Sequence, residues 1–321
     1  MAMLVTAQLI GVDVSKAELV ICLDPKQPLL ILANEARAIH QWFKTLPGNT
    51  HCLAVEATNT FHLELVMQAH KRGITVYVID GFRLNRYRDS IGGRAKTDAS
   101  DARLLWRYLD HEREDLRPWS PPSDGYVAIQ RLLHRRSTLV KAKVALAQSL
   151  REFTELKSAA NTLLRQLGRI DQLIQRQLCR LILRHGWQDE VTRCQGIEGV
   201  GPITAAALTM SFHRGPFCNS DAFIAFLGMD VRVRDSGKHT GRRRLTKRGD
   251  PELRRLLHLA AMRACRTLAW KAFYQRYLAR GLTKTQALVI LARKLARVTF
   301  SLLKNGTTYQ PKTPLEACDA T

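Results

Sequence analysis

The first third of the chain alternates short apolar runs with amphipathic segments. Apolar runs bounded by turn residues predict buried strands at residues 8–14, 18–23, 29–32, 52–55 and 74–79. Apolar residues at helical spacing predict helices over residues 36–46, 61–72 and 98–111. A strand followed by a hairpin, and then by alternating helices and strands, predicts an α/β domain over residues 1–120.

The pattern becomes helical after a proline-containing linker at residues 118–122. One set of apolar residues recurs every seven positions, and a second set follows steps of four and three: Leu139, Leu146, Phe153; Leu163, Leu167, Ile170, Ile174, Leu178, Leu181. This spacing is typical of a coiled-coil seam and predicts a helical coiled-coil region over residues 121–190. Two arrangements remain open, an antiparallel hairpin within one subunit and a coiled coil between subunits.

The third region, residues 191–310, is also mostly helical in pattern. Long amphipathic helices with basic polar faces are predicted at residues 250–268 and 283–304. Residues 311–321 show no periodicity, so we expect a flexible tail.

The net charge of the chain indicates which class of partner it binds. Lys and Arg number 50 against 28 Asp and Glu, which gives a net charge of +22 in 321 residues. A content of 45% hydrophobic and 24% charged residues is typical of a folded globular protein and excludes a disordered one. Such a basic surface attracts polyanions, and the release of counterions from nucleic acid is the usual source of affinity. We therefore expect a nucleic-acid-binding protein.

The cysteines and the apolar runs bear on location. The seven cysteines are scattered and never form a C-x-x-C pair, which argues against a disulfide framework and a zinc site. Most of them lie within apolar runs and are interpreted as small core residues in a reducing cytoplasm. No uncharged run approaches the ~20 residues of a membrane span, and the N-terminus lacks a signal-peptide pattern. We expect a cytoplasmic protein.

Four carboxylates in the first domain are the strongest chemical signal. Asp13 and Glu56 each follow an apolar run, and Asp98 and Asp101 lie three residues apart on one predicted helix face. Each has an ordinary alternative. Asp98 could cap the helix with Asp101 at the third helical position, Glu56 could pair with an arginine, and Asp13 could cap a turn.

Taken together, the four acids predict a metal site. Four carboxylates in one place cannot all stay ionised without a cation, and hard oxygen ligands select Mg²⁺ or Mn²⁺. In a chain this basic, such a cluster predicts metal-assisted cleavage of phosphodiester bonds. Acids on the first strand, on a later strand and on a late helix match the ribonuclease-H-like arrangement.

Two glycines in the third region suggest a phosphate contact. Gly199 and Gly201 precede a helix whose unpaired N–H groups could bind a phosphate backbone, as in a helix-hairpin-helix-like element. The alternative is an ordinary tight turn between helices.

A basic loop surrounds one serine. Its cations are expected to bind nucleic acid: Arg232, Arg234, Lys238, Arg242, Arg243, Arg244, Lys247 and Arg248. Glycines at 237, 241 and 249 would let backbone approach a ligand closely. From the residues alone, Ser236 is a hydroxyl well placed among cations, with Lys238 and His239 as possible bases.

These motifs resemble the DEDD-type insertion-sequence transposases, the family of the Piv invertases and of the bridge-RNA-guided recombinases. Residues 11–16, 55–58 and 96–102 resemble its RuvC-like N-terminal domain. Residues 199–205, 225–228, 236–237 and 246–251 resemble its C-terminal transposase domain. The likeness covers about residues 8–300 and includes the order and spacing of the motifs.

The resemblance implies a DNA transposase or recombinase. Asp13, Glu56, Asp98 and Asp101 would be its Mg²⁺-binding (or Mn²⁺-binding) tetrad. Ser236 would attack DNA to form a phosphoserine link that a free 3′-hydroxyl later reverses. The resemblance also implies homodimers or homotetramers with sites shared between subunits, and a structured noncoding guide RNA that pairs with donor and target DNA.

Two other functions compete with this interpretation. A nuclease of the Holliday-junction-resolvase type would need only the four acids and a metal-activated water. A non-catalytic nucleic-acid-binding protein would have kept the fold and lost an acid. The second motif set around Ser236 favours the recombinase over the nuclease, and the presence of all four acids disfavours the non-catalytic protein.

Overall fold

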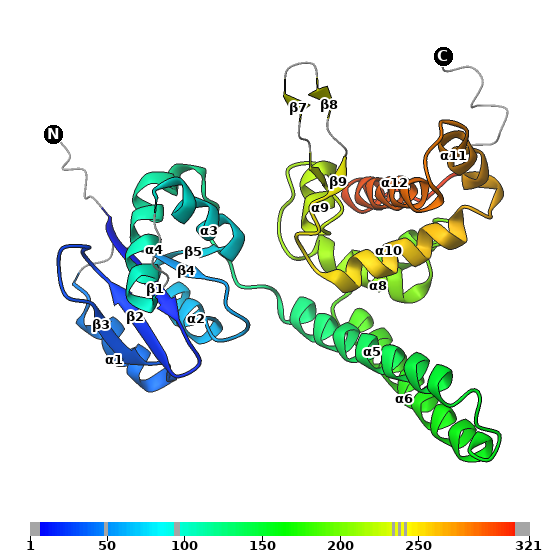
Figure 1. The fold of residues 1–321 in the computed structure, drawn as a ribbon, viewed down its shortest axis with the longest axis horizontal. Helices are drawn as coiled ribbons and strands as arrows, with labels where there is room; N and C mark the ends of the chain where they lie inside the picture. The colour runs from blue at the N-terminus through cyan, green and yellow to red at the C-terminus, as the bar shows by residue number, and fades with distance from the viewer. Residues whose placement is uncertain are drawn as a thin grey trace. The chain divides into compact units, whose positions relative to one another are not determined.

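A computed structural model describes residues 7–47, 51–92, 97–232, 235–236, 239–240 and 243–311 of the chain. It divides into two compact units, Met1–Pro121 and Pro122–Thr321, whose elements are labelled in Figure 1. Each unit has its own hydrophobic core and is described separately.

The first unit is built on a five-stranded sheet with the strand order β3-β2-β1-β4-β5. Its strands are β1 Gln8–Val14, β2 Glu18–Cys22, β3 Leu30–Ala33, β4 His51–Glu56 and β5 Thr75–Ile79. The first three strands are antiparallel neighbours, whereas β1, β4 and β5 run parallel. The mixed α/β sheet expected from the sequence is confirmed.

Helices cover both faces of this sheet. They are α1 Ala36–Thr45, α2 Leu63–Lys71, α3 Gly81–Ser90, α4 Asp98–Glu112 and the short 3-10 helix η1 Arg113–Asp115. Leu53 and Val55 of β4 pack with α1 and α2, while Cys52 and Ala54 pack with α3 and α4. Alternate residues of a strand point to opposite faces, so β4 contributes to both cores.

Helix α3 was missed in the sequence, where its residues looked only like a basic stretch. The side chain of Asp80 caps it by accepting hydrogen bonds from the backbone N–H groups of Phe82 and Arg83, at 3.0 and 3.2 Å. Leu84 and Arg88 are its buried residues, and they lie one helical turn apart. With a single apolar anchor among basic residues, the helix leaves too weak a periodic pattern to predict.

Helix α4 lies directly against β1 because residue 11 is glycine. A Cβ atom at Gly11 would lie 2.3 Å from the carbonyl oxygen of Ala102 and 2.4 Å from the backbone nitrogen of Trp106. The indole N–H of Trp106 donates to the carbonyl oxygens of Leu9 and Leu23, at 3.1 and 3.2 Å. These contacts fix the helix across the strand that carries Asp13.

The N-cap of α4 is not the residue that one alternative interpretation of the sequence suggested. Thr97 is the N-cap and forms a capping box with Ser100. The suggestion that Asp98 caps the helix, with Asp101 at the third position, is therefore wrong. Both acids lie within the first helical turn, where negative charge also interacts favourably with the helix dipole.

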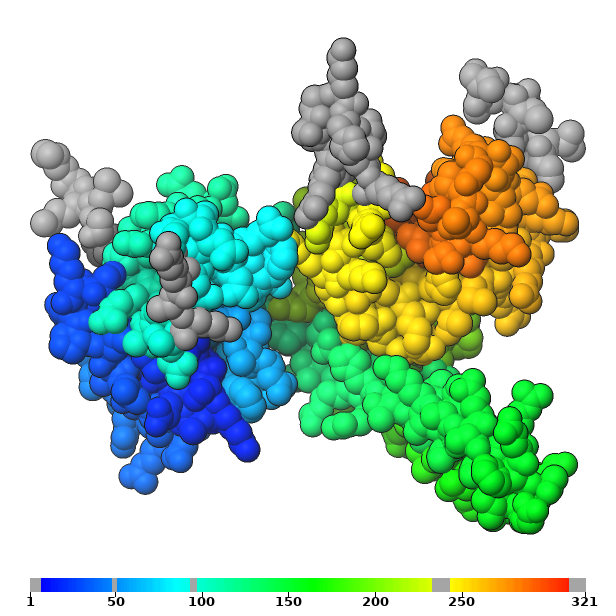
Figure 2. Space-filling view, viewed as in Figure 1, coloured from blue at the N-terminus to red at the C-terminus, as the bar shows by residue number. Residues whose placement is uncertain are grey.

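The second unit begins with two long helices, α5 Asp124–Ser149 and α6 Lys157–Arg184. They pack along one another as a hairpin within one chain, which forms an extended arm of this unit (Figure 2). Arg136 and Asp171 form an ion pair between them at 2.8 Å. Of the predicted seam residues, Leu178 is buried, whereas Leu163 and Ile170 are exposed.

The rest of the second unit is mostly helical, as expected. Its elements are α7 Gln188–Gln195, α8 Pro202–Phe212, α9 Ser220–Phe226, β6 Val231–Arg232, β7 Asp235–Ser236, β8 His239–Thr240, β9 Arg244–Leu245, α10 Pro251–Ala264, α11 Leu268–Ala279 and α12 Lys284–Asn305. The helix expected over residues 250–268 is confirmed as α10 but ends earlier than expected, because the chain turns after Ala264 and α11 begins at Leu268. No glycine or proline marks this break in the sequence.

Helix α8 is the centre of the core of this unit, with residues Thr204–Ser211 buried on all sides and α10 and α12 packed beside it. Among the residues described, none of the helices has the length and apolar character to cross a bilayer.

Candidate active site

Three of the four predicted acids converge at one edge of the sheet. Asp13 lies near the end of β1, Glu56 ends β4, and Asp101 lies in the first turn of α4. One carboxylate oxygen from each lies within 4.8 Å of the other two. Because β1 and β4 are parallel neighbours, their carboxyl ends meet at the same edge, and α4 brings the third acid across β1.

The fourth acid lies beside this group. Asp98 is exposed and is not one of the three converging residues. It is nevertheless close enough to act on Asp13 through its charge. The structure therefore brings Asp13, Glu56 and Asp101 together and leaves Asp98 at the margin.

Burial and the neighbouring acids both act on the carboxylate of Asp13. Burial and the charges of Asp101, Asp98 and Glu56 raise the pKa of Asp13 from 3.8 to about 6, while a backbone hydrogen bond at Val14 opposes the rise. Both causes penalise the ionised carboxylate. A cation bound among these oxygens would remove the penalty.

The donor set fits a divalent cation. All three donors are carboxylate oxygens, the ligands preferred by hard cations such as Mg²⁺, Mn²⁺ and Ca²⁺. Oxygen ligands lie ~2.1 to ~2.5 Å from such ions, so two ligands of one ion can be ~4 to ~5 Å apart. Oxygens within 4.8 Å of one another can therefore reach the same ion. Asp13, Glu56 and Asp101 are the residues that would hold it.

Arg88 contacts the cluster, although the sequence pattern does not distinguish it from the other arginines around it. Its guanidinium donates to Oδ1 of Asp101 at 2.6 Å, and both side chains are buried. It also donates to Oδ1 of Asn85 at 2.5 Å, and Ser100 Oγ donates to the same oxygen of Asp101 at 3.2 Å. Part of the negative charge of the cluster is thus balanced from within the protein.

Gly81 makes room for Glu56. A Cβ atom at Gly81, the first residue of α3, would lie 2.3 Å from Oε1 of Glu56. The pair Asp80-Gly81 after β5 was the available signal, because a capping residue followed by glycine marks a turn where backbone approaches another group.

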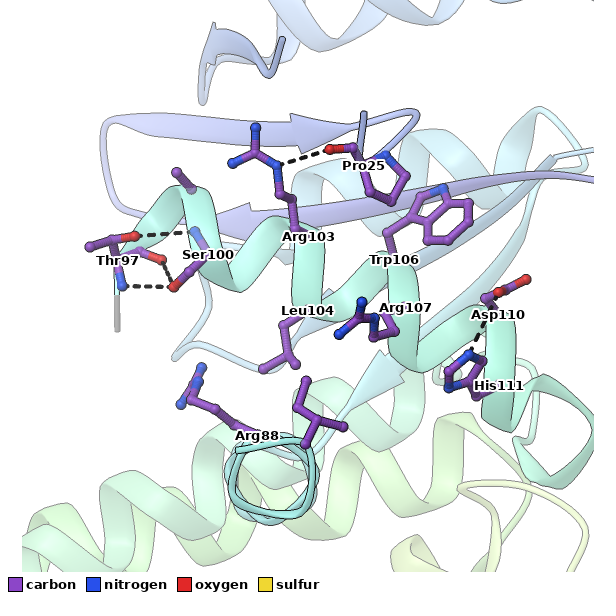
Figure 3. A pocket seen from close by; sticks show the side chains of 12 residues that line it. Pro25, Arg88, Thr97, Ser100, Arg103, Leu104, Trp106, Arg107, Asp110 and His111 are labelled. Carbon is purple, nitrogen blue, oxygen red and sulfur yellow. Dashed lines mark hydrogen bonds and ion pairs between the residues drawn. The ribbon is translucent and has the colours of Figure 1, made fainter. Parts of the chain in front are cut away.

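A groove of about 790 Å³ opens along one side of α4 (Figure 3). Its lining includes Ser100, Arg103 and Arg107 of α4 and Arg88 of α3. Figure 3 shows Arg103 directed toward Pro25, to whose carbonyl oxygen its Nε donates at 3.4 Å. Because Arg88 both lines the groove and contacts Asp101, the groove lies beside the acidic cluster.

The predicted serine lies in a small hairpin of the second unit. Ser236 is in β7 and pairs with His239 of β8 in an antiparallel register. The side chain of Ser236 lies outside the described part of the chain, as do the whole residues Arg234, Lys238 and Arg242. The backbone thus places Ser236 within a two-stranded hairpin.

Four of the predicted nucleic-acid-binding cations line a second groove. Arg232 of β6 lies opposite Arg244 of β9 in the antiparallel backbone register. These two residues, with Arg243 and Lys247, line a groove of about 990 Å³ against α12. All four are exposed, as is Arg248 outside the groove. Exposed cations on one groove are suited to binding a polyanion.

Two other arginines near this loop have internal partners. Arg254 donates to the carbonyl oxygen of Gly249 at 2.8 Å. Arg255 forms an ion pair with Glu252 at 2.5 Å, and Glu252 also accepts a hydrogen bond from Ser137 of α5 at 2.7 Å. These contacts give both arginines a structural role.

The paired glycines have different environments. Gly199 has a φ of +94°, and a Cβ atom there would lie 2.6 Å from Cβ of Ala264 and 2.7 Å from the carbonyl oxygen of Ala260. Its glycine is therefore required for packing against α10. Gly201 is the N-cap of α8 and is followed by Pro202. Phosphate binding at these glycines stays a prediction from the sequence.

Two family models match the chain. The model of the DEDD transposases of IS110, described as Transposase, matches residues 10–159. The model described as Transposase IS116/IS110/IS902 family matches residues 191–275. The first match includes all four acids, and the second includes Ser236 and the basic loop.

Curated relatives agree with these matches. The pilin gene-inverting protein of Moraxella bovis is 26% identical over 286 residues, covering 84% of this chain and 86% of its own. The probable family 20 transposase of Pseudomonas aeruginosa is 28% identical over 311 residues, covering 85% and 89%. A 43.6 kDa protein of insertion element IS110 from Streptomyces coelicolor is 34% identical over 121 residues, covering 37% and 30%.

Proposed function

Because this chain is a DNA transposase with both domains of the IS110/IS116/IS902 family, we propose that it cuts and rejoins the DNA of an insertion sequence through a phosphoserine intermediate. The acidic cluster and Ser236 share the chemistry. The observation that supports this most is the convergence of Asp13, Glu56 and Asp101 from two strands and a helix.

The acids would act on the phosphate through a bound cation. Asp13, Glu56 and Asp101, with Asp98 at the margin, are the residues that would hold Mg²⁺ or Mn²⁺. When bound, the cation would supply positive charge that stabilises the oxygens around the reacting phosphorus. Arg88 holds Asp101 in place and balances part of its charge.

Ser236 acts as the nucleophile. Its Oγ forms a bond to phosphorus while the bond from phosphorus to the 3′-oxygen breaks, and the departing oxygen takes up a proton as a free 3′-hydroxyl. A 3′-hydroxyl then attacks the phosphoserine and restores both the phosphodiester and the serine. The exposed cations Arg232, Arg243 and Arg244 hold the DNA backbone near this hairpin.

The same proposal assigns four regions. Residues 1–120 form a RuvC-like domain that binds the metal, residues 121–190 form a helical region that assembles dimers or tetramers by coiled-coil contacts, residues 191–310 form the transposase domain with the serine, and residues 311–321 form a tail. A structured noncoding RNA guides donor and target DNA to the cytoplasmic enzyme. The net charge of +22 and the aromatic content of 7% support backbone binding more than base stacking.

A hydrolytic nuclease of the Holliday-junction type is the second candidate. It is supported by one observation, that Asp13, Glu56 and Asp101 all belong to the first unit and bring three carboxylate oxygens within reach of one cation. In this mechanism a water molecule would replace Ser236 as the nucleophile.

Covalent trapping separates the two. Protein, Mg²⁺, the element's flanking transcript and labelled junction DNA are mixed, denatured and resolved on a gel. We expect a labelled adduct with wild type and with Ser301→Ala, an exposed serine of α12, and no adduct with Ser236→Ala. Cleaved DNA without an adduct, still produced by Ser236→Ala, would establish the nuclease.

A further inference from the structure

The groove between the β6–β9 pair and α12 carries an additional cation that the sequence did not suggest. Besides the four exposed cations on and beside β6 and β9 (Arg232, Arg243, Arg244 and Lys247), it is lined by Arg293 of α12. Arg293 is the least exposed of the five cations. Among the residues that the structure assigns to this lining, none is acidic. The groove thus places cations from two separate elements around one space.

Arg293 lacks a full set of partners. Its Nε atom is buried and has no hydrogen-bond partner within the described residues. A buried guanidinium N–H without an acceptor is costly, and charged donors bind most strongly to anionic oxygens. An anion in the groove would supply the missing acceptor.

Two acids act on Arg293 through their charges, and each of them has another partner. Asp221 forms an ion pair with Arg297 at 2.5 Å, and Asp230 accepts a hydrogen bond from the hydroxyl of Thr246. Burial and the charge of Arg297 lower the pKa of Arg293, while Asp221 and Asp230 only partly oppose this. Asp221 is paired with Arg297, so of these two acids only Asp230 offsets the five cations that line the groove.

The size and walls of the groove point to the kind of ligand. A volume of about 990 Å³ is that of a site for a nucleotide-sized segment, well beyond a single inorganic ion. Val231, Leu245 and Val289 add apolar surface between the cations. Apolar walls lower the local dielectric, which strengthens the attraction between guanidinium groups and phosphate.

The groove is close to Ser236 along the chain. Arg232 precedes Ser236 by four residues, which span at most about 13 Å of extended strand. That length corresponds to about four base pairs of duplex rise. A phosphate held at Arg232 thus belongs to DNA near the serine.

We propose that this groove binds the phosphodiester backbone of the DNA strand that Ser236 attacks, within a few base pairs of the scissile bond, and that Arg293 is one of its phosphate-binding residues. This rests on the proposed function only for the identity of the attacked strand. Binding itself is measured without catalysis, in the Ser236→Ala background, so the two proposals can fail separately.

The first test compares two neutral substitutions on one helix. Arg293→Gln and Lys294→Gln each remove one charge from α12, but only Arg293 lines the groove, whereas Lys294 is exposed. Affinity for the junction duplex is measured by fluorescence anisotropy over a series of salt concentrations, after thermal melting has shown both variants folded. We expect Arg293→Gln to bind about tenfold more weakly and to reduce the salt slope by about 1, with Lys294→Gln within about twofold of wild type.

The second test locates the phosphate. A neutral methylphosphonate is placed at successive positions of each DNA strand. At one or two positions, we expect the methylphosphonate to weaken DNA binding by the protein that keeps Arg293. At the same positions, it should cause no further loss of DNA affinity in the Arg293→Gln variant. Independent losses at every position, or coupled positions about ten or more base pairs from the bond that the trapping assay shows to be cut, would overturn the proposal.

A third arm uses RNA of the same sequence as the DNA strand. Because the groove contacts phosphate and not bases, we expect Arg293→Gln to weaken binding of this RNA no more than binding of the DNA duplex. A loss of affinity for RNA with none for DNA would assign the groove to RNA and overturn the proposal. The variant Arg293→Lys, which keeps the charge, should recover much of the DNA affinity. If Arg293→Lys does not recover the affinity and also has a lowered melting temperature, Arg293 has a structural role alone.

Discussion

Arg88 and Asp101 form a buried ion pair inside the acidic cluster, with Nη2 of Arg88 donating to Oδ1 of Asp101 at 2.6 Å. Asp101 is one of the three acids that could hold a cation, so Arg88 is a neighbour of the site that no spacing rule selects. The pair couples α3 to α4 and fixes the carboxylate that reaches toward Asp13.

Loss of this arginine should destabilise the first unit. Arg88→Met leaves the buried carboxylate of Asp101 without its partner, which costs about 3 kcal/mol in similar cases. We expect the urea midpoint of unfolding to fall accordingly in metal-free buffer, and the loss to shrink when Mn²⁺ is added. Arg107→Met, an exposed arginine of α4, is the control. Equal stability of the two variants would show that the pair is not important for folding.

The close approach of α4 to β1 predicts a second effect. A methyl group at residue 11 would meet backbone atoms of Ala102 and Trp106, which cannot rotate away as a side chain can. Gly11→Ala should therefore destabilise the protein by about 2 kcal/mol and weaken cation binding, because α4 carries Asp101. Gly215→Ala is the matched control, since no atom lies within 4 Å of a Cβ atom there. Calorimetry on both variants measures the effect. A Gly11→Ala variant that melts like wild type would contradict the predicted clash with the backbone of α4.

The raised pKa of Asp13 gives a pH dependence with a defined sign. The pKa is 3.8 for the ordinary group and about 6 in the folded protein, so the folded state binds this proton more tightly than the unfolded state. The contribution of Asp13 to stability is therefore fully present below about pH 4 and is lost as the pH rises through 6.

Asp13→Asn should remove this decline. Without divalent ions, we expect the variant to gain about 1 kcal/mol over wild type between pH 5 and 7.5, after allowance for solvent screening of a half-buried group. Urea melts of both proteins at several pH values in EDTA measure the difference. A constant difference across this range would contradict the assigned repulsion.

The acids could be found in the sequence because each depends on local pattern. Asp13 and Glu56 follow buried runs, parallel strands end at a common edge, and the spacing of Asp98 and Asp101 places them on one helix face. Which of the two helix acids points at Asp13 depends on how α4 crosses β1 at Gly11, a long-range contact that spacing does not contain.

The cations were harder to assign for the same reason. Among 50 Lys and Arg residues, charge alone does not distinguish Arg88 or Arg293 from residues on a solvated surface. The first is identified by its contact with Asp101, and the second by its buried Nε and its place in the groove. Both relationships join segments that the sequence pattern treats separately. The break between α10 and α11 was also missed, since no residue that ends helices stands there.

A titration of Mn²⁺ followed by electron paramagnetic resonance tests most directly whether the three acids form a metal site. Wild type and Asp110→Asn, an exposed acid of α4 outside the cluster, should bind the ion alike. Asp13→Asn and Asp101→Asn should each weaken binding at least about tenfold, because each removes one of three converging ligands. Undiminished Mn²⁺ binding by Asp13→Asn, in a protein that remains folded, would contradict the assignment of this cluster as the metal site.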